Sequence, residues 1–444
     1  MRWQEEILGF KKALGRWDSV AIITAIVIGV GIFRAPAEVA GYLKHPWLIL
    51  SAWFLGGVIC LLGVFCYAEL ASTFPKTGGN YIYLRESYGR GVGFLFAWSE
   101  LLVIRTGSIA AVSFIGAEYL QSLLAIDKSF IKLMAVSIVL ILSLLNIFGL
   151  SYGKKVHNFF TAINIAALVS IVFFGLISRK GDMAHFFSGA VSLDSALLRA
   201  LGAALIPILW TYGGWHENTF VAEETKDASR VIPQALIIGI SIVTALYLAV
   251  NFFYIYLIPV KDLAGSALVG SDVFNVLYGA QGRKIFELLV VAASLGSINA
   301  MIITGARITY AMAKDNAIFA YLGKINARYD TPHRAIAINA LWCSILILLG
   351  TFNKLLFFTG ILVWLFFASA AAGIFVLRKK FPALERPYKV WGYPATPIIF
   401  ILICITLFIN TLIFNPVPSL FGLGLLASGV PVYVVSRLRE ARRV

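Results

Sequence analysis

The sequence predicts an all-α membrane protein with twelve transmembrane helices, of which the first and the sixth are broken. The chain of 444 residues is 60% hydrophobic and only 13% charged, whereas soluble domains carry about 25% charged residues. Twelve apolar stretches are long enough to cross a bilayer, which takes roughly 20 residues each. Closely spaced glycines interrupt two of them, at Gly29 and Gly31 and at Gly213 and Gly214.

The predicted spans form a single transmembrane domain, residues 1–444, without a soluble appendage. The longest outer connection, about residues 259–283, is expected to carry short surface helices. The approximate limits of the spans are 17–43, 47–73, 92–122, 131–150, 156–178, 196–222, 232–258, 284–313, 334–350, 354–377, 393–414 and 417–436.

The first span is interrupted by the sequence GVGIFRAP, residues 29–36, with apolar residues on both sides. Unwound backbone at this depth is tolerated only where it lines a protein or water cavity. The N–H groups of Val30 and Gly31 would open the outer half-helix and attract a carboxylate. The carbonyls of Val27 and Ile28 would end the inner half-helix and attract an ammonium group. The first break therefore predicts a site for a small zwitterion.

The sixth span is interrupted in the same way at WTYGGW, residues 210–215. It lies five spans after the first, and because five is an odd number, a second five-span unit begins on the opposite side of the membrane. Broken segments in corresponding positions are typical of inverted-repeat transporters, whose substrate site lies at the breaks. Close helix packing is the alternative explanation of the glycine pair.

The second break can complete the site that the first one begins. The carbonyls of Trp210, Thr211 and Gly213 can add to the ammonium site. An α-amino acid carries its two charges about one peptide unit apart, so the breaks fit it without a charged side chain, which would cost several kcal/mol at this depth. Trp210 is expected to close over the substrate as a gate, and the alternative is an ordinary lipid-facing or core aromatic residue.

Two polar residues within the spans are candidates for gating or coupling. Arg105 lies in the middle of a span, and such a residue is a functional-site hypothesis by default. The alternative is a structural ion pair with Glu100, Glu118 or a carboxylate on another helix. His216 follows the second break, where a buried neutral histidine and a proton-handling one are both open.

Other charged residues lie near the ends of the spans. Arg34 and Glu38, one turn apart on the outer half-helix, are expected to pair with each other. Glu69, Glu223 and Glu224 lie close to basic residues on the inner side. Inner-gate salt bridges and ordinary interfacial charges are both open there.

The net charge of +15 is distributed unevenly along the chain. With a cytoplasmic N-terminus, the inner segments hold 24 Lys and Arg and the outer loops hold 10. This asymmetry follows the positive-inside rule and predicts a multi-pass protein of the plasma (inner) membrane with both termini in the cytoplasm. The basic face is expected to meet anionic membrane lipid and not nucleic acid.

Signatures of other functional classes are missing from the sequence. It has no Walker loop, no metal-ligand cluster and no acidic filter ring. An enzyme, a primary pump and a channel are therefore not expected, and neither is a cofactor or a metal. The four cysteines, Cys60, Cys66, Cys343 and Cys404, lie in apolar spans, which predicts no disulfide framework.

Several motifs, in order along the chain, resemble the amino acid–polyamine–organocation (APC) superfamily and, within it, the L-type amino acid transporter (LAT) branch. GVGIFRAP is similar to the family pattern GSGIF followed by Pro, and YGGWHENTFVAEE (212–224) resembles the signature YGGWN…VTEE. WSELLVIR (98–105) resembles a LAT motif that includes the intramembrane Arg. Further similar segments are CYAELASTFPKTGGNYIYLRESYG (66–89), GSINAMIITGAR (296–307), LRKKFPALERPYKV (377–390) and SGVPVY (428–433).

The resemblance implies the LeuT fold, a 5+5 inverted repeat with two added helices. The repeats would cover about 17–178 and 196–377, and the added helices about 393–436. The resemblance also implies sodium-independent transport of amino acids, often by obligatory exchange. Trp364 matches a tenth-helix Trp near the family's pocket, and the family's substrate-binding positions map onto Val27, Val30, Gly31, Trp210, Thr211 and Gly213.

Three positions depart from the family pattern. Val30 replaces the usual Ser, and His216 stands where LAT members often carry Asn. Asn164 takes the place of a fifth-helix Lys that stands in for a cation between the first and eighth helices. We expect the Asn164 amide to bond a carbonyl near Gly29, directly or through water, so that no sodium is needed.

The link between the third and fourth spans, about residues 121–130, contains no Cys. Vertebrate members of the family use a Cys there to bond a heavy subunit. No disulfide-linked heavy subunit is therefore expected for this chain.

Together these observations predict a secondary transporter of L-amino acids that works by alternating access. Neutral substrates are favoured because no acidic side chain is evident near the breaks. Exchange and facilitated or proton-linked uptake are both open. Two alternatives are a cation-coupled importer of amines or polyamines and a transporter-like amino acid sensor.

Overall fold

The computed structural model is helical along almost its whole length. Within the part of the chain that it describes, nine helices are long and apolar enough to cross a membrane, and two shorter apolar helices, Ala162–Ile177 and His333–Leu349, join them. The predicted all-α membrane class is therefore confirmed. The structure describes residues 14–76, 78–149, 154–187, 195–315, 319–326, 328–329 and 331–441.

The first five predicted spans all appear as helices. The first is divided into α1 (Arg16–Val27), the 3₁₀ turn η1 (Val30–Phe33) and α2 (Ala35–Leu43). The short helix α4 (Asn80–Tyr88) lies between the second and third spans. The remaining four are α3 (Pro46–Thr73), the continuous run of α5 (Arg90–Ser99), η2 (Glu100–Ile104) and α6 (Arg105–Leu124), then α7 (Ile131–Ile147) and α8 (Lys154–Ile177).

The sixth span is broken like the first, into α9 (Ser195–Thr211) and the 3₁₀ segment η5 (Trp215–Glu224). The outer connection at 259–283 carries α11 (Val260–Gly265) and the first turns of α12, as the sequence predicts. The later spans are α10 (Ala228–Leu257), α12 (Val269–Asp315, kinked at Gly279), α13 (His333–Leu349), α14 (Phe352–Lys380), α15 (Ala395–Phe414) and α16 (Pro416–Ala441).

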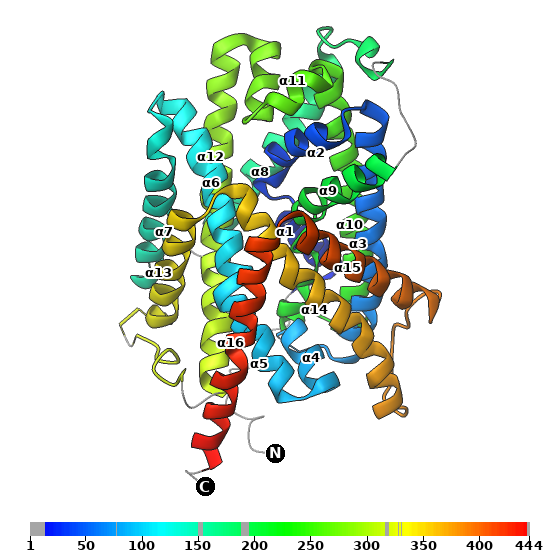
Figure 1. Cartoon of the computed structure of the whole chain (residues 1–444), viewed down its shortest axis with the longest axis vertical. Coiled ribbons are helices and arrows are strands. Elements are labelled where there is room, and N and C mark those ends of the chain that lie inside the picture. The colour runs from blue at the N-terminus through cyan, green and yellow to red at the C-terminus, as the bar shows by residue number, and fades with distance from the viewer. Residues whose placement is uncertain are drawn as a thin grey trace.

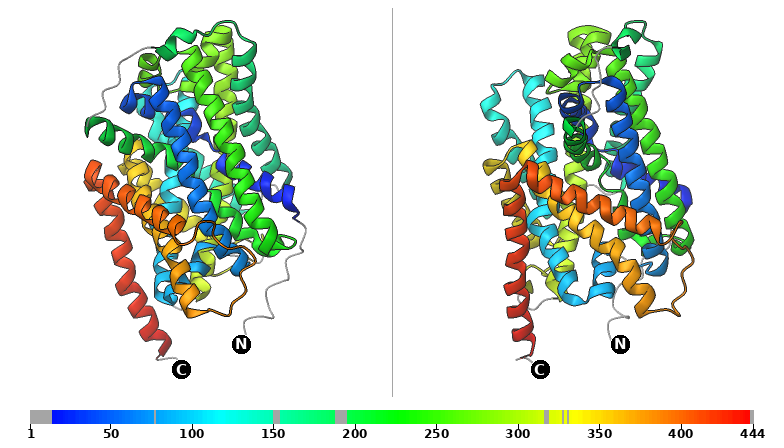
Figure 2. Two further views of the ribbon diagram at one scale, coloured as in Figure 1. Left: turned by 90° about the vertical axis from the view of Figure 1, so that its right-hand side faces the viewer. Right: turned by 45° about the vertical axis from the view of Figure 1, so that its right-hand side comes forward.

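The two broken helices lie in the interior of the bundle. α10 packs along α3 and against α1, while α12 packs against α6 and α8, and α2 packs against α9. Figure 1 shows α1 in the middle of the molecule, with α7 and α13 forming one side. The end of α16 lies at the same end of the molecule as α4 and α5, and α11 lies at the opposite end, while the tilted α15 crosses one face in Figure 2. The breaks are therefore enclosed by protein, as unwound backbone in a membrane requires.

A buried carboxylate fixes the segment after α14 to the end of α3. Glu69 is 2% exposed and accepts two hydrogen bonds from Arg378, at 2.9 and 2.6 Å. It also accepts one from the amide of Val390 at 2.8 Å. Of the inner-gate salt bridges considered from the sequence, the structure shows a salt bridge at Glu69; its role as a gate stays a prediction. The side chains of Glu223 and Glu224 lie outside the described residues.

We expect Glu69→Ala to lower the free energy of unfolding by about 3 kcal/mol, because it leaves a guanidinium and a buried amide without their acceptor. Thermal unfolding in detergent measures the loss. Glu86→Ala is the matched control: Glu86 pairs with Arg85 where about a third of both side chains is exposed, so its removal should cost less than about 1 kcal/mol. Equal losses in the two variants would contradict the prediction.

Candidate functional site

The first break has the backbone geometry that the sequence predicts. α1 ends where the amide of Ile28 bonds the carbonyl of Thr24 at 2.9 Å. Gly29 is extended, with φ −96° and ψ 177°. Val30 and Gly31 are the first two residues of η1, so their amides precede the first hydrogen-bonded turn of that segment. The amides that begin η1 and the carbonyls that end α1 therefore lie within a few residues of one another.

The second break follows Thr211, the last residue of α9. Its chain reversal depends on Gly214, whose φ of +94° lies in the region that favours glycine. The amide of Gly213 turns back to the carbonyl of Trp210 at 2.9 Å. η5 then starts at Trp215, which packs at 4.8 Å between ring centroids against Tyr67 of α3.

The two breaks are in direct contact. A Cβ added to Gly31 would lie 2.9 Å from the Trp210 ring and 3.1 Å from the Thr211 hydroxyl. A Cβ added to Gly214 would lie 2.8 Å from the side chain of Ile26. The backbones cross this closely only because glycine is present at both places. The structure therefore brings the predicted residues of the two breaks together.

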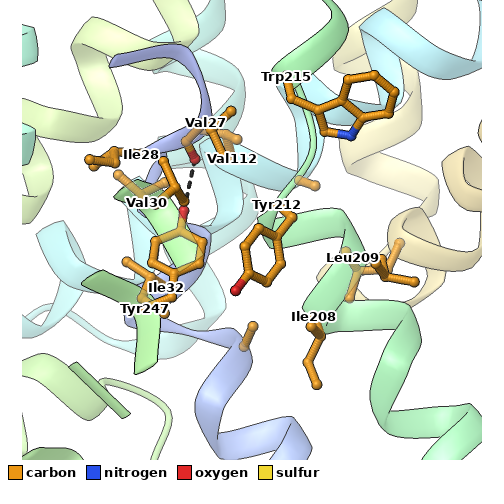
Figure 3. Packing of buried hydrophobic residues seen from close by; sticks show 14 of the residues in the cluster. Val27, Ile28, Val30, Ile32, Val112, Ile208, Leu209, Tyr212, Trp215 and Tyr247 are labelled. Atoms are coloured by element: carbon orange, nitrogen blue, oxygen red, sulfur yellow. Dashed lines mark hydrogen bonds between the residues drawn. The ribbon is translucent and has the colours of Figure 1, made fainter. Parts of the chain in front are cut away.

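A tyrosine that the sequence analysis did not single out links the two breaks. The hydroxyl of Tyr247, on α10, lies 2.8 Å from the carbonyl oxygen of Val27 and 3.2 Å from that of Thr211. Figure 3 shows Tyr247 reaching up to Val27. A hydroxyl carries one hydrogen, so it donates to one of the two carbonyls at a time. Tyr247 thus satisfies backbone that helix formation leaves without a partner.

Two further tyrosines bond carbonyls of the first break. Tyr119 donates to the carbonyl of Phe33 at 3.0 Å, and Tyr254 donates to that of Ile32 at 3.4 Å. All three tyrosines are fully buried. Tyr247 and Tyr254 are seven residues apart on one helix and so lie on the same face, a signal from which the sequence could have revealed them.

Aromatic and charged groups extend outward from the second break. Trp210 packs edge-on against Phe352 at 5.6 Å between ring centroids, and the guanidinium of Arg34 lies over Phe352 at 5.5 Å. Arg34 pairs with Glu38 at 3.3 Å, as the sequence predicts, and with Glu118 at 3.4 Å. This column connects the gate candidate Trp210 to the ion pairs of α2 and α6.

Arg105 is held by two carboxylates. Its side chain is 5% exposed, and it lies 3.3 Å from Glu100 and 3.0 Å from Glu217. Of the partners considered from the sequence, Glu100 is correct, Glu118 is wrong because it pairs with Arg34, and Glu217 is the carboxylate on another helix. Glu100 begins η2, a π-helical turn, and such turns are frequent at functional sites.

His216 and Trp364 lie beside the second break. His216 packs edge-on against Phe367 of α14 at 5.0 Å between ring centroids. Trp364, 5% exposed, also packs against Phe367, at 6.1 Å. Among the described residues its indole nitrogen has no hydrogen-bond partner. It borders a small cavity that is also lined by Ile59, Cys60, Leu209, Trp215, Phe367 and Phe400.

Asn164 is buried on α8, but its bond differs from the direct one that we expected. Its amide lies 3.3 Å from the hydroxyl of Ser297 on α12, so the direct bond to a carbonyl near Gly29 is wrong. Its carbonyl oxygen is buried without a partner among the described residues. The physical reason is that Tyr247 already satisfies the Val27 carbonyl at the end of α1. Asn164 therefore links the fifth and eighth spans.

Comparison with known proteins identifies the family. The sequence model of the amino acid permease family matches residues 14–433. The chain belongs to the amino acid permease family. The predicted membership of the LAT branch and the predicted LeuT fold are confirmed by this match and by the relatives described next. Like its relatives, this permease is a multi-pass membrane transporter of amino acids and not an enzyme.

Three relatives illustrate the similarity of this permease to known members. It is 28% identical over 436 residues to the serine/threonine exchanger SteT of Bacillus subtilis (strain 168), covering 98% of each chain. It is 30% identical to the human b(0,+)-type amino acid transporter 1, covering 91% of this chain and 84% of that one. It is also 30% identical to the mouse large neutral amino acids transporter small subunit 2, covering 96% and 81%.

We expect Tyr247→Phe to slow amino acid transport about tenfold or more while the protein stays folded, because a buried carbonyl loses its donor at a cost of roughly 1–3 kcal/mol. Initial uptake rates in liposomes and thermal stability in detergent measure the two effects. Tyr254→Phe is the matched control, since it removes a longer bond of 3.4 Å that involves only one break. A transport defect that is no larger in Tyr247→Phe than in Tyr254→Phe would contradict the linking role.

Proposed function

We propose that this permease exchanges neutral L-amino acids across the plasma membrane, without sodium, by alternating access. The observation that carries the proposal is the contact between the two helix breaks at Gly31, Trp210 and Thr211. It brings amides and carbonyls that lie outside regular helix hydrogen bonding to one place within the bundle, where a zwitterion can bind both. The charge asymmetry of the sequence supports cytoplasmic termini.

In the proposed complex, the substrate carboxylate accepts hydrogen bonds from the amides of Val30 and Gly31. The ammonium group donates to the carbonyls of Val27, Ile28, Trp210, Thr211 and Gly213. Two of these carbonyls, those of Val27 and Thr211, face the Tyr247 hydroxyl. The ammonium group therefore competes with that hydroxyl, and binding loosens the link between the breaks. Trp210 would move off Gly31 to admit the substrate and close again over it.

The neutral preference has support from charge and from relatives. Among the described side chains, Glu217 is a carboxylate near the second break, and Arg105 neutralises it at 3.0 Å, so it is not free to attract a cationic substrate. The names of two relatives specify serine and threonine and large neutral amino acids, and one is named an exchanger. The competing proposals are an importer of amines or polyamines and an amino acid sensor.

We further propose that the chain works without a disulfide-linked heavy subunit, although one relative is named a small subunit. The four cysteines are buried and unbonded within the spans, and residues 121–130 contain none. We also propose that the chain is built from two inverted repeats of five spans, at about 17–178 and 196–377, followed by two added helices at about 393–436.

Uptake of labelled amino acids into liposomes tests the proposal. Uptake should be strong when the liposomes contain an unlabelled neutral amino acid and weak when they are empty. Equal uptake in both would favour uniport, preference for an amine would favour the importer, and binding without uptake would favour the sensor.

We expect Gly31→Val to abolish transport while the protein stays monodisperse in detergent. The added side chain would collide with Trp210 and Thr211 and cover the amides that bind the carboxylate. The decarboxylated amine of a preferred substrate should compete poorly with it. Wild-type uptake by Gly31→Val, or equal competition by the amine, would rule out the carboxylate site. Gly41→Val is a matched control, because a Cβ there meets nothing within 4 Å.

We expect uptake to be the same in sodium and in choline buffer, because the Tyr247 and Asn164 bonds already hold the first, fifth and eighth spans. Asn164→Ala should slow transport, and Asn164→Lys should be tolerated or should favour exchange. Asn146→Ala, which removes another buried amide bonded to α12, serves as the control. Strong stimulation by sodium would reject sodium independence, and unchanged kinetics in Asn164→Ala would reject the role of Asn164.

A further inference from the structure

We propose that Glu100, Arg105 and Glu217 form a proton-binding site that controls movement of the inner half of the sixth helix. The inference rests on the proposed amino acid transport. It extends that function by making the rate of transport depend on protonation. The observation that supports it is an excess of carboxylates over cations among these three buried side chains.

The charges of this cluster do not balance. One guanidinium lies between two carboxylates, at 3.3 Å from Glu100 and 3.0 Å from Glu217. The side chains of Glu100 and Arg105 are 3% and 5% exposed. When all three groups are ionised, the cluster carries one negative charge, and an unbalanced charge buried within a membrane protein is costly. One added proton makes the cluster neutral.

No other cation within the described part of the chain pairs with the cluster. Arg307, on α12, is exposed and forms no ion pair with it. The charged residues of α10, α13, α14 and α16 lie near the ends of those helices. Further titratable groups on the surrounding elements include His216 on η5, Tyr67 on α3, Tyr83 on α4, Tyr310 on α12, Cys343 on α13 and Tyr433 on α16.

The two carboxylates occupy different kinds of element. Glu100 is on η2 within the continuous third span, next to Arg105. Glu217 is on η5, the segment that follows the second break. The Arg105–Glu217 contact therefore ties the third span to a half-helix that must move in alternating access.

The burial of the two carboxylates decides which one binds the proton. The side chain of Glu100 is 3% exposed and that of Glu217 is 16% exposed, and Glu100 lies farther from the guanidinium, at 3.3 Å against 3.0 Å. Burial disfavours the ionised form of a carboxylate, so the proton binds to Glu100. A protonated Glu100 gives up its ionic bond, and Arg105 then pairs with Glu217 alone. The proton thus strengthens the contact that holds η5, and transport should slow as the pH falls.

Counterflow of a labelled neutral amino acid, with equal pH inside and outside liposomes, tests the inference in the full-length protein. Between about pH 8 and pH 5.5 the wild-type rate should fall by about fivefold or more, the size expected of a coupled conformational step. Either single substitution to glutamine removes the excess charge, so both variants should lose this pH dependence. Glu217→Gln has no ionic lock and should be fast throughout, whereas Glu100→Gln keeps a balanced Arg105–Glu217 pair and should be slow throughout.

Control variants separate this role from a general effect. Glu287→Gln changes a carboxylate that is equally buried and paired with Arg283, and it should keep the wild-type pH profile. His216→Gln should also keep it. A wild-type rate that does not depend on pH, unaltered profiles in both glutamine variants, or loss of the profile in His216→Gln or Glu287→Gln would overturn the proton site. Absence of counterflow at every pH would instead overturn the proposed transport. Thermal stability identifies any variant that fails to fold, and Glu217→Ala and Glu100→Ala then replace the glutamine variants.

Discussion

Unwound backbone inside a membrane must find its hydrogen-bond partners within the protein, and this constraint shapes the centre of the permease. Both breaks expose amides and carbonyls that a continuous helix would pair. Buried tyrosines supply donors to the first break, and Tyr247 reaches carbonyls of both breaks. The surrounding helices are therefore arranged to deliver hydroxyl groups to two short stretches of main chain. Because a hydroxyl bond is modest in strength, the same arrangement can open for a competing donor.

The helices were predictable from the sequence because their signal is local. A run of about 20 apolar residues must be helical in a bilayer, so the predicted limits and the two breaks agree with the structure to within a few residues. The kink of α12 at Gly279 was not predicted. α12 begins inside the predicted outer connection, residues 259–283, and continues into the predicted span that follows it. Composition alone does not separate a surface helix from the span that it joins.

Partners across the bundle were harder to predict, since they depend on the rotation of each helix. The sequence identified Arg105 as notable, but it did not name Glu217, which lies 112 positions away. Asn164 was identified by analogy with a charged residue of the family. Tyr247 bonds the Val27 carbonyl at the end of α1, and the Asn164 amide bonds Ser297 instead. Tyrosines in apolar spans are common, so the roles of Tyr119, Tyr247 and Tyr254 became evident only from their oxygen contacts.

The contact between Gly31 and Trp210 has a consequence for the membrane itself. An empty binding site that stayed open would give water and small ions a continuous path whenever the two gates fell out of step. Here an aromatic ring lies directly on the glycine backbone, in the place proposed for the substrate. Leakage is then limited by protein packing and not by the bound amino acid. A cell carrying this permease would keep its ion gradients even when nutrients are scarce.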